Sequence, residues 1–215
     1  MHLLFDLDGT LTDSFPGICQ SVNHALAEIG CERVSDARLR PFVGAPLRTI
    51  FRALTSSDDP ALLRRALAVY RARFDEIGIL ENRVFPGIPE ALGTFRSSGH
   101  SLQVVTARSA ASARHVVRHF AIDHYFDAVH GPEPADHACE KSELVLAALR
   151  AARASATETI MIGDRADDIH AARTHDVRAV AVRWGYGAPD EIAAAGPHYV
   201  AESVADLVAW VQSAP

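Results

Sequence analysis

From residue 86 onward, short apolar runs alternate with segments of helical periodicity, and this alternation constrains the fold more than any other feature. The runs have the length and composition of buried strands: Ser101–Thr106, Tyr125–His130, Thr159–Gly163 and Ala179–Trp184. Helical patterns lie between and after them, near 87–98, 109–120, 142–153, 166–175, 189–195 and 203–212. Strands that are separated in this way by helices predict a mostly parallel sheet with helices on both faces, in the α/β class.

One further strand lies far from the others in the sequence. His2–Leu7 is a short apolar run that stops at the turn Asp8-Gly9-Thr10. The stretch after it carries helical patterns without a strand-like run: Pro16–Gly30, a short segment after Ser35, Leu47–Leu54 and Pro60 to about Ile77. We therefore expect a Rossmann-like core domain made of residues 1–13 and 86–215, and an all-helical domain made of residues 14–85.

Composition and charge favour a soluble cytoplasmic protein. The net charge is −6 and the basic residues form no block, which argues against nucleic-acid binding. No apolar run approaches the roughly 18 residues of a membrane span, and the N-terminus lacks the basic region of a signal peptide. Three scattered cysteines fit a reducing compartment. We expect a monomer or a homodimer, with no membrane or nucleic-acid partner.

The chain uses arginine almost to the exclusion of lysine. It contains 20 Arg and one Lys, Lys141. The two residues are nearly equivalent on a solvated surface, but they differ where a compact point charge is needed, because the guanidinium is a broad planar fork. Lys141 is therefore a candidate for a role that requires an ammonium group.

Polar residues follow three of the predicted strands, at the sheet edge where parallel α/β folds bind ligands. The first strand ends in Asp6, Asp8 and Thr10, and the second in Thr106. Thr159–Gly163 is followed by Asp164 and Asp168, and Lys141 starts the helix between these strands. Separate chain segments thus bring four carboxylates, hydroxyl groups and the single lysine to one edge.

Four carboxylates at one edge would repel one another unless a cation lay among them. Oxygen ligands without His or Cys at ligand spacing favour Mg²⁺, which binds one or two carboxylates and keeps water and substrate oxygens as its other ligands. A hydroxyl and an ammonium beside such an ion can hold a phosphate. The residues therefore favour phosphoryl transfer, in which positioning and charge stabilisation provide most of the catalysis.

These segments resemble the motifs of the haloacid dehalogenase superfamily, in order and over nearly the whole chain: Asp6-Leu7-Asp8-Gly9-Thr10, Thr106, Lys141 and Gly163-Asp164-Arg165-Ala166-Asp167-Asp168. The chain is most similar to the phosphoglycolate-phosphatase-like branch, through Gly44-Ala45-Pro46-Leu47, Val84-Phe85-Pro86-Gly87-Ile88 and Trp184-Gly185-Tyr186-Gly187. The resemblance implies that residues 14–85 form the cap domain of that branch.

The resemblance also implies the catalytic roles. Asp6 would be the nucleophile that accepts the phosphoryl group. Asp8 would protonate the leaving alcohol and then activate water. Mg²⁺ would be held by the Asp6 carboxylate, the Asp8 backbone carbonyl and the Asp164 carboxylate, while Asp168 would orient a metal-bound water or Lys141.

The resemblance implies phosphate-binding and supporting roles for further residues. Thr106, Lys141 and the backbone N–H of Ala107 would bind phosphoryl oxygens, and Thr10 would hold Asp8. An Asp two residues after the nucleophile is the phosphatase and phosphomutase pattern, so we do not expect a dehalogenase.

Several positions depart from the family pattern. Ala107 and Arg108 stand where relatives often carry Asn or Ser and then Lys. Ala138 replaces an Arg that often precedes the motif lysine by three positions, and Ser142 replaces a Pro. These departures leave the identity of the substrate undetermined, but they do not change the expected type of reaction.

We expect a small phosphomonoester substrate, such as phosphoglycolate, a sugar phosphate or a nucleoside 5′-monophosphate. Phe15, Arg48, Arg52 and Arg108 are candidates for selecting it, since an arginine can pair with a second anionic group. A phosphomutase is the main alternative, and a non-enzymatic phosphate-binding protein is a further one. A phosphonate hydrolase would need a cap lysine, which the sequence lacks.

Overall fold

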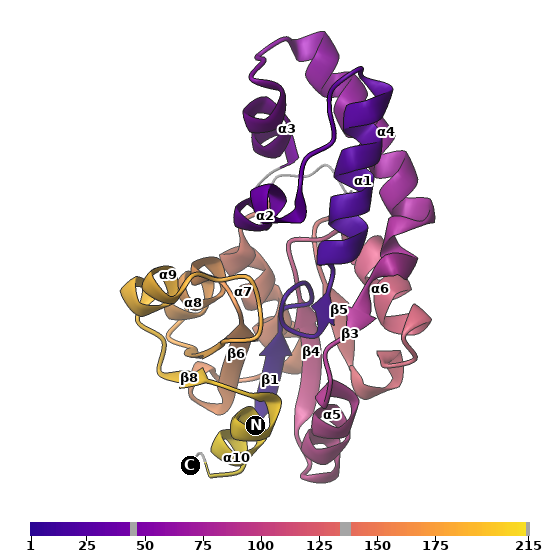
Figure 1. Ribbon diagram of the computed structural model, residues 1–215. Helices are drawn as coiled ribbons and strands as arrows, with labels where there is room; N and C mark the ends of the chain where they lie inside the picture. Colours follow the sequence, from indigo (N-terminus) through magenta and orange to yellow (C-terminus); the bar gives the residue numbers. More distant parts are fainter. Residues whose placement is uncertain (44–46, 134–138, 214–215) are drawn as a thin grey trace. The chain divides into compact units, whose positions relative to one another are not determined.

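The computed structural model describes residues 1–43, 47–133 and 139–213. By its contacts the chain divides into two compact units. The core unit comprises Met1–Asp13 and Val84–Pro215, and the helical unit comprises Ser14–Arg83. The short strands β2 (Thr12–Asp13) and β3 (Arg83–Val84) mark the two places where the chain passes from one unit to the other (Figure 1).

The core unit is built on a six-stranded sheet with the order β5-β4-β1-β6-β7-β8. Its strands are β1 (His2–Phe5), β4 (Ser101–Val105), β5 (Ala128–His130), β6 (Thr159–Gly163), β7 (Arg178–Val182) and β8 (Tyr199–Ala201). Each neighbouring pair in this order is parallel. Phe5, near the end of β1, lies opposite Val104 of β4 and Ile162 of β6, so these three central strands end at one level.

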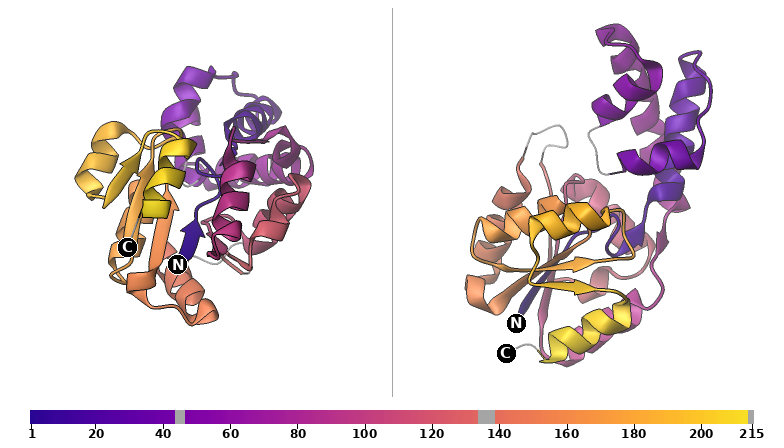
Figure 2. Two further views of the ribbon diagram at one scale, coloured as in Figure 1. Left: turned by 90° about the horizontal axis from the view of Figure 1, so that it is seen from below. Right: turned by 60° about the vertical axis from the view of Figure 1, so that its left-hand side comes forward.

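Helices cover the two faces of this sheet because successive residues of a buried strand point to opposite sides. Leu4 packs in the apolar cluster that contains Val145 and Ile169, whereas the ring of Phe5 lies 6.1 Å from that of Phe95 on the other face. The helices are α5 (Ile88–Ser97), α6 (Ala110–His119), α7 (Lys141–Ala152), α8 (Ala166–Arg173), α9 (Pro189–Ala195) and α10 (Val204–Ser213). Figure 2 shows α5 and α10, which contact each other, side by side.

Two details of the core differ from the sequence prediction. The predicted strand Tyr125–His130 begins only at Ala128, because Asp123–Tyr125 forms a 3₁₀ turn and Asp127 is held by the backbone N–H of Leu102 and the hydroxyl of Ser101. Strand β8 was not predicted, since three residues are too few to show a period of two. A further short 3₁₀ helix spans Ala156–Glu158.

The helical unit consists of α1 (Phe15–Glu28), α2 (Asp36–Leu39), α3 (Leu47–Thr55) and α4 (Pro60–Glu76), with 3₁₀ turns at Arg40–Phe42 and Gly78–Glu81. Helix α4 begins where Asp59 accepts a hydrogen bond from the backbone N–H of Ala61 (2.9 Å), with Pro60 at the first helical position. Its buried residues include Tyr70 and Phe74, one turn apart, whose rings stack at 5.4 Å. Helices α1 and α4 pack together.

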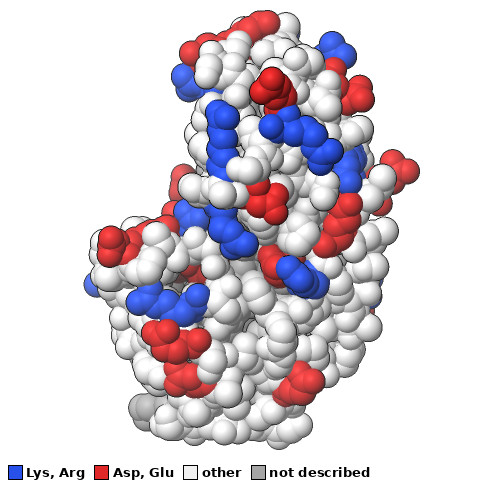
Figure 3. All heavy atoms as spheres, in the orientation of Figure 1, with Lys and Arg blue, Asp and Glu red and all other residues white. Residues whose placement is uncertain are grey.

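The surface carries both signs of charge. On the face shown in Figure 3, Lys and Arg side chains are interspersed with Asp and Glu side chains. Among the described residues, no helix has both the length and the apolarity to cross a bilayer.

Candidate active site

The predicted site residues come together at the carboxyl edge of the three central strands. Asp6 directly follows β1, Thr106 follows β4 and Asp164 follows β6. Since β1 lies between β4 and β6 in a parallel sheet, these three positions meet at one edge. Lys141 is the first residue of α7 and contributes from outside the strands.

Lys141 lies between two carboxylates. Its Nζ is 2.5 Å from Oδ1 of Asp168 and 3.2 Å from Oδ1 of Asp6. The lysine side chain is 12% exposed, and those of Asp6 and Asp168 are 8% and 1% exposed, so these charges face one another largely out of solvent. Attraction between charges is strong in such surroundings, and the compact ammonium fits between two carboxylates.

The carboxylates of Asp6, Asp164 and Asp168 form one buried cluster, in which one oxygen from each lies within 4.8 Å of the others. Both oxygens of Asp168 have a donor. Besides Lys141, it accepts a hydrogen bond from the backbone N–H of Arg165 (3.0 Å), at the start of α8. The three carboxylates are thus close enough together to share one cation.

Asp164 is held by two donors. The hydroxyl of Thr10 donates to its Oδ1 (3.2 Å) and the backbone N–H of Tyr186 to its Oδ2 (2.7 Å). The family resemblance implies that Thr10 holds Asp8. That expectation is corrected here, because the turn after β1 directs the Thr10 hydroxyl toward the end of β6.

Two glycines allow the backbone to approach Asp164. Gly9 has a φ of +90°, and a Cβ there would lie 2.4 Å from Oδ2 of Asp164. A Cβ at Gly185 would lie 2.3 Å from the Cβ of Asp164. Both distances are shorter than real contacts allow, so only glycine fits the turn after β1 and the loop after β7.

The segment Trp184–Gly187 supports the site and had no assigned role in the sequence analysis. The indole Nε1 of Trp184 donates to the backbone oxygen of Thr10 (3.0 Å). The hydroxyl of Tyr186 donates to Asp13 (2.9 Å), so that this loop contacts both sides of the first-motif turn. In the sequence, this segment is marked by its alternation of aromatic residues and glycines. That pattern does not reveal which groups the loop contacts.

Burial sets the proton affinities of the cluster. It raises the pKa of Asp6 to about 8; Lys141 opposes this rise, whereas Asp168, Asp164 and Asp8 add to it. Burial likewise raises the pKa of Asp164 to about 7, with Asp168 adding to it and the Tyr186 N–H among the groups that oppose it. For Lys141, burial disfavours the charged form, but Asp168 and Asp6 outweigh it and raise the pKa. The ammonium therefore persists at neutral pH, and a further positive charge would favour ionisation of Asp6 and Asp164.

Asp8 has a different cationic partner. Nη2 of Arg108 donates to Oδ1 of Asp8 (2.8 Å) and Nε to Oδ2 (2.9 Å). Of the two positions expected for Arg108, near the substrate or facing solvent, the second is wrong, since its side chain is 11% exposed and paired with Asp8. Contact of Arg108 with the substrate stays a prediction. Thr106 is buried and its hydroxyl accepts a hydrogen bond from the N–H of Arg108 (3.2 Å), while Ala107 between them is exposed.

Other predicted residues lie in the helical unit. The ring of Phe15 is buried and has the guanidinium carbon of Arg40 4.6 Å from its centroid. Arg48 is exposed on α3, and Arg52 pairs with Asp58 on the surface. Of the positions noted in the sequence, Gly44-Ala45-Pro46 and Ala138 lie outside the described residues.

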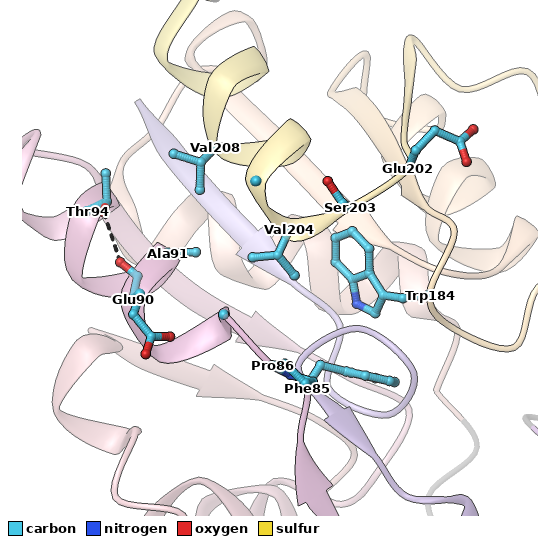
Figure 4. Close-up of a pocket in the computed structure, with 12 residues that line it drawn as sticks. Phe85, Pro86, Glu90, Ala91, Thr94, Trp184, Glu202, Ser203, Val204 and Val208 are labelled. Carbon is cyan, nitrogen blue, oxygen red and sulfur yellow. Dashed lines mark hydrogen bonds between the residues drawn. The ribbon is translucent and has the colours of Figure 1, made fainter.

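A separate cavity of about 730 Å³ lies in the core unit, lined largely by apolar parts of α5 and α10 (Figure 4). Phe85, Pro86 and Val204 contribute to its wall, and none of the predicted site residues does. Trp184 links it to the turn after β1 through the hydrogen bond to Thr10, and the backbone N–H of Phe85 donates to Leu11 in the same turn (3.1 Å). The carboxylate cluster and this cavity are therefore distinct features.

Comparison with known proteins places the chain in a family. Residues 3–182 match the family model of the haloacid dehalogenase-like hydrolases. A 5′-nucleotidase of Pseudomonas aeruginosa is 42% identical over 95% of this chain and 92% of its own length. A phosphoglycolate phosphatase of Photobacterium profundum is 29% identical, over 99% and 96%.

Solved structures agree with this placement. The crystal structure of a predicted phosphatase from Clostridium acetobutylicum superposes with a TM-score of 0.89 at 31% identity, over 99% of this chain and 98% of that one. The chain therefore belongs to the haloacid dehalogenase-like hydrolases and is a phosphatase-type member of that family, similar to its phosphoglycolate phosphatases.

Proposed function

We propose that the protein is a Mg²⁺-dependent hydrolase of small phosphomonoesters, and that it acts through a phosphoryl group carried on Asp6. The observation that supports this most directly is the position of Lys141 between Asp6 and Asp168, beside the buried cluster of carboxylates. A nucleophilic carboxylate, a neighbouring ammonium and a set of oxygen ligands are the groups that such a reaction requires.

The residues present fit a magnesium ion. Its ligands would be the carboxylates of Asp6 and Asp164 with the backbone carbonyl of Asp8, all hard oxygen donors. The raised pKa values of Asp6 and Asp164 express the cost of burying these carboxylates without a further cation. When bound, Mg²⁺ supplies positive charge that neutralises phosphoryl oxygens near the carboxylates.

The protein groups then divide the reaction into two steps. In the first step, Asp6 forms a bond to phosphorus while the bond to the ester oxygen breaks, and Asp8 donates a proton to the departing alcohol. In the second step, Asp8 takes a proton from water as the water oxygen attacks phosphorus, which releases phosphate and restores Asp6. Lys141, the hydroxyl of Thr106 and the N–H of Ala107 hold the phosphoryl oxygens.

For the substrate class, our proposal is supported by the relatives rather than by the core residues. Two of them are named as a 5′-nucleotidase and a phosphoglycolate phosphatase. We propose that this protein acts on the same kinds of small phosphomonoester, with sugar phosphates as a further class. We further propose that the helical unit acts as a cap and that Phe15 and Arg48 select the substrate. A phosphomutase would use the same groups but would need a bisphosphate activator.

A phosphate-release screen with Mg²⁺ over a panel of phosphomonoesters tests this function. Wild-type protein is expected to release phosphate without a bisphosphate activator, and Asp6→Asn serves as the blank. The panel is repeated with Arg48→Ala. If Arg48 selects the substrate, this variant should have a lower catalytic efficiency for esters that carry a second anionic group. Failure of wild-type protein to exceed the blank on every ester would contradict the proposed function, and a requirement for a bisphosphate would favour the mutase.

The buried carboxylates predict that magnesium stabilises the protein more at higher pH. In metal-free protein the pKa values of Asp6 and Asp164, about 8 and about 7, lie above their ordinary value of 3.8. The folded state then binds more protons than the unfolded state from about pH 4 to about pH 8, so stability falls as pH rises through this window. Mg²⁺ removes this disadvantage, because binding a metal displaces protons from its ligands.

Thermal unfolding with EDTA and with Mg²⁺ measures this effect. The increase in Tm on adding Mg²⁺ should be small near pH 5 and should grow toward pH 8. Asp164→Asn is the matched variant and should lose most of the increase. An increase in Tm that is independent of pH, or that survives in Asp164→Asn, would contradict the assignment of this cluster as the metal site.

A further inference from the structure

The two cations of the site are divided between different carboxylates. Lys141 pairs with Asp6 and Asp168, whereas Arg108 pairs with Asp8. The Arg108 contact is bidentate, with Nη2 and Nε 2.8 and 2.9 Å from the two carboxylate oxygens. A bidentate pair of this kind fixes the plane of a carboxylate as well as its charge, which a single contact does not do.

Arg108 is itself held in place. Its backbone N–H donates to the hydroxyl of Thr106 (3.2 Å), which sets the turn after β4. Its Nη1 donates to the hydroxyl of Ser112 (3.4 Å), in the first turn of α6. Ser109 caps that helix, and its hydroxyl accepts from the N–H of Ser112. The guanidinium thus contacts the start of a helix, and the Arg108 backbone is held at the end of a central strand.

We propose that Arg108 is a positioning residue, which acts through Asp8 by fixing the orientation of its carboxylate for proton exchange with the leaving alcohol and the attacking water. This inference rests on the proposed function and deepens it. Asp8 is 25% exposed and lies in the turn after β1, where the carboxylate could otherwise rotate away from the reacting oxygen. Each carboxylate oxygen has more than one acceptor direction, so contact with Arg108 leaves Asp8 able to meet a second partner.

The inference predicts a dependence on the leaving group. The alcohol of an alkyl phosphate leaves as a strongly basic alkoxide unless its oxygen is protonated. The 4-nitrophenolate of 4-nitrophenyl phosphate is a weak base and leaves without an acid. We expect Arg108→Gln to lower kcat for an alkyl phosphomonoester by about 10- to 100-fold, a part of the roughly 10²- to 10⁴-fold that acid–base catalysis contributes. The change in KM should stay below about threefold, and the initial burst of 4-nitrophenol from its phosphate, which needs no acid, should fall much less.

A double-mutant cycle separates action through Asp8 from direct binding of the substrate. In an Asp8→Asn background, Arg108→Gln should cause little further loss of kcat, because the group that it positions is already gone. Arg108→Lys, which keeps the charge but not the fork, should recover only part of the activity. Arg114→Gln is the matched control, since Arg114 lies on α6 and pairs with Glu133 at the surface; it should match wild type.

The outcomes are distinguishable. If Arg108→Gln raises KM with kcat unchanged, or multiplies the loss in the Asp8→Asn background, Arg108 binds the substrate directly and the positioning role is wrong. If Arg108→Gln turns over the alkyl ester at the wild-type rate while Asp8→Asn does not, the inference fails and the proposed function stands. If wild-type protein hydrolyses no ester at all, both fail together.

Discussion

Asp6→Asn is expected to lower turnover by roughly 10⁴-fold or more, because it removes the nucleophile from a mechanism with a covalent intermediate. The amide is nearly isosteric with the carboxylate, and the change removes a buried charge, so the fold should survive. Lys141 keeps its partner Asp168 in this variant. The comparison is the rate of phosphate release under saturating Mg²⁺ and substrate.

Asp167→Asn is the control for this experiment. Asp167 is exposed on α8, next to the buried Asp168, so the same chemical change at this position should leave the rate within about twofold of wild type. Circular dichroism and thermal unfolding of both variants establish that they are folded. An Asp6→Asn protein that retained a tenth or more of wild-type turnover would show that the nucleophile lies elsewhere.

Replacement of Lys141 should have the second largest effect. Lys141→Met removes the ammonium that we assign to the phosphoryl oxygens, and we expect kcat to fall by roughly 10²- to 10³-fold, as when a comparable charge-stabilising donor is lost. Lys141→Arg should recover little of this, because the broad guanidinium cannot replace a point charge between Asp6 and Asp168, which lie 3.2 and 2.5 Å from Nζ.

The same replacement should also lower stability, for a separate reason. It leaves the buried carboxylates of Asp6 and Asp168 without their partner, a situation that typically costs roughly 3–5 kcal/mol. The double variant Lys141→Met/Asp168→Asn removes one of these charges and should regain part of the free energy of unfolding in urea, yet none of the activity. Recovery of activity together with stability would mean that Lys141 has a structural role only.

The edge of the sheet where the site lies could be predicted from the sequence, since it follows from the parallel order of the strands. An apolar run that carries Asp6 near its end, and another that is followed by Asp164, must end at one edge if both strands are parallel neighbours. The excess of arginine over lysine singled out Lys141 by a separate route. Both arguments depend on spacing and composition, which the sequence contains.

The pairing of side chains within the site could not be predicted in the same way. Thr10 holds Asp164 instead of Asp8, and Arg108 holds Asp8, because partner choice depends on turn geometry and side-chain direction at the level of a few ångströms. The approach of Gly185 to Asp164 also depends on the return of a distant loop. Such contacts are properties of the tertiary structure, and local sequence patterns leave them open.

The most direct test of the proposed mechanism is to trap the phosphorylated enzyme. In Asp8→Asn, 4-nitrophenyl phosphate can still transfer its phosphoryl group, because its leaving group needs no acid, whereas hydrolysis of the intermediate is slowed by loss of the base. Rapid acid quenching followed by peptide mapping should find the phosphoryl group on Asp6, together with a burst of about one nitrophenol per protein molecule. Steady release of phosphate without a phosphorylated enzyme, or a phosphoryl group on any residue other than Asp6, would contradict the mechanism.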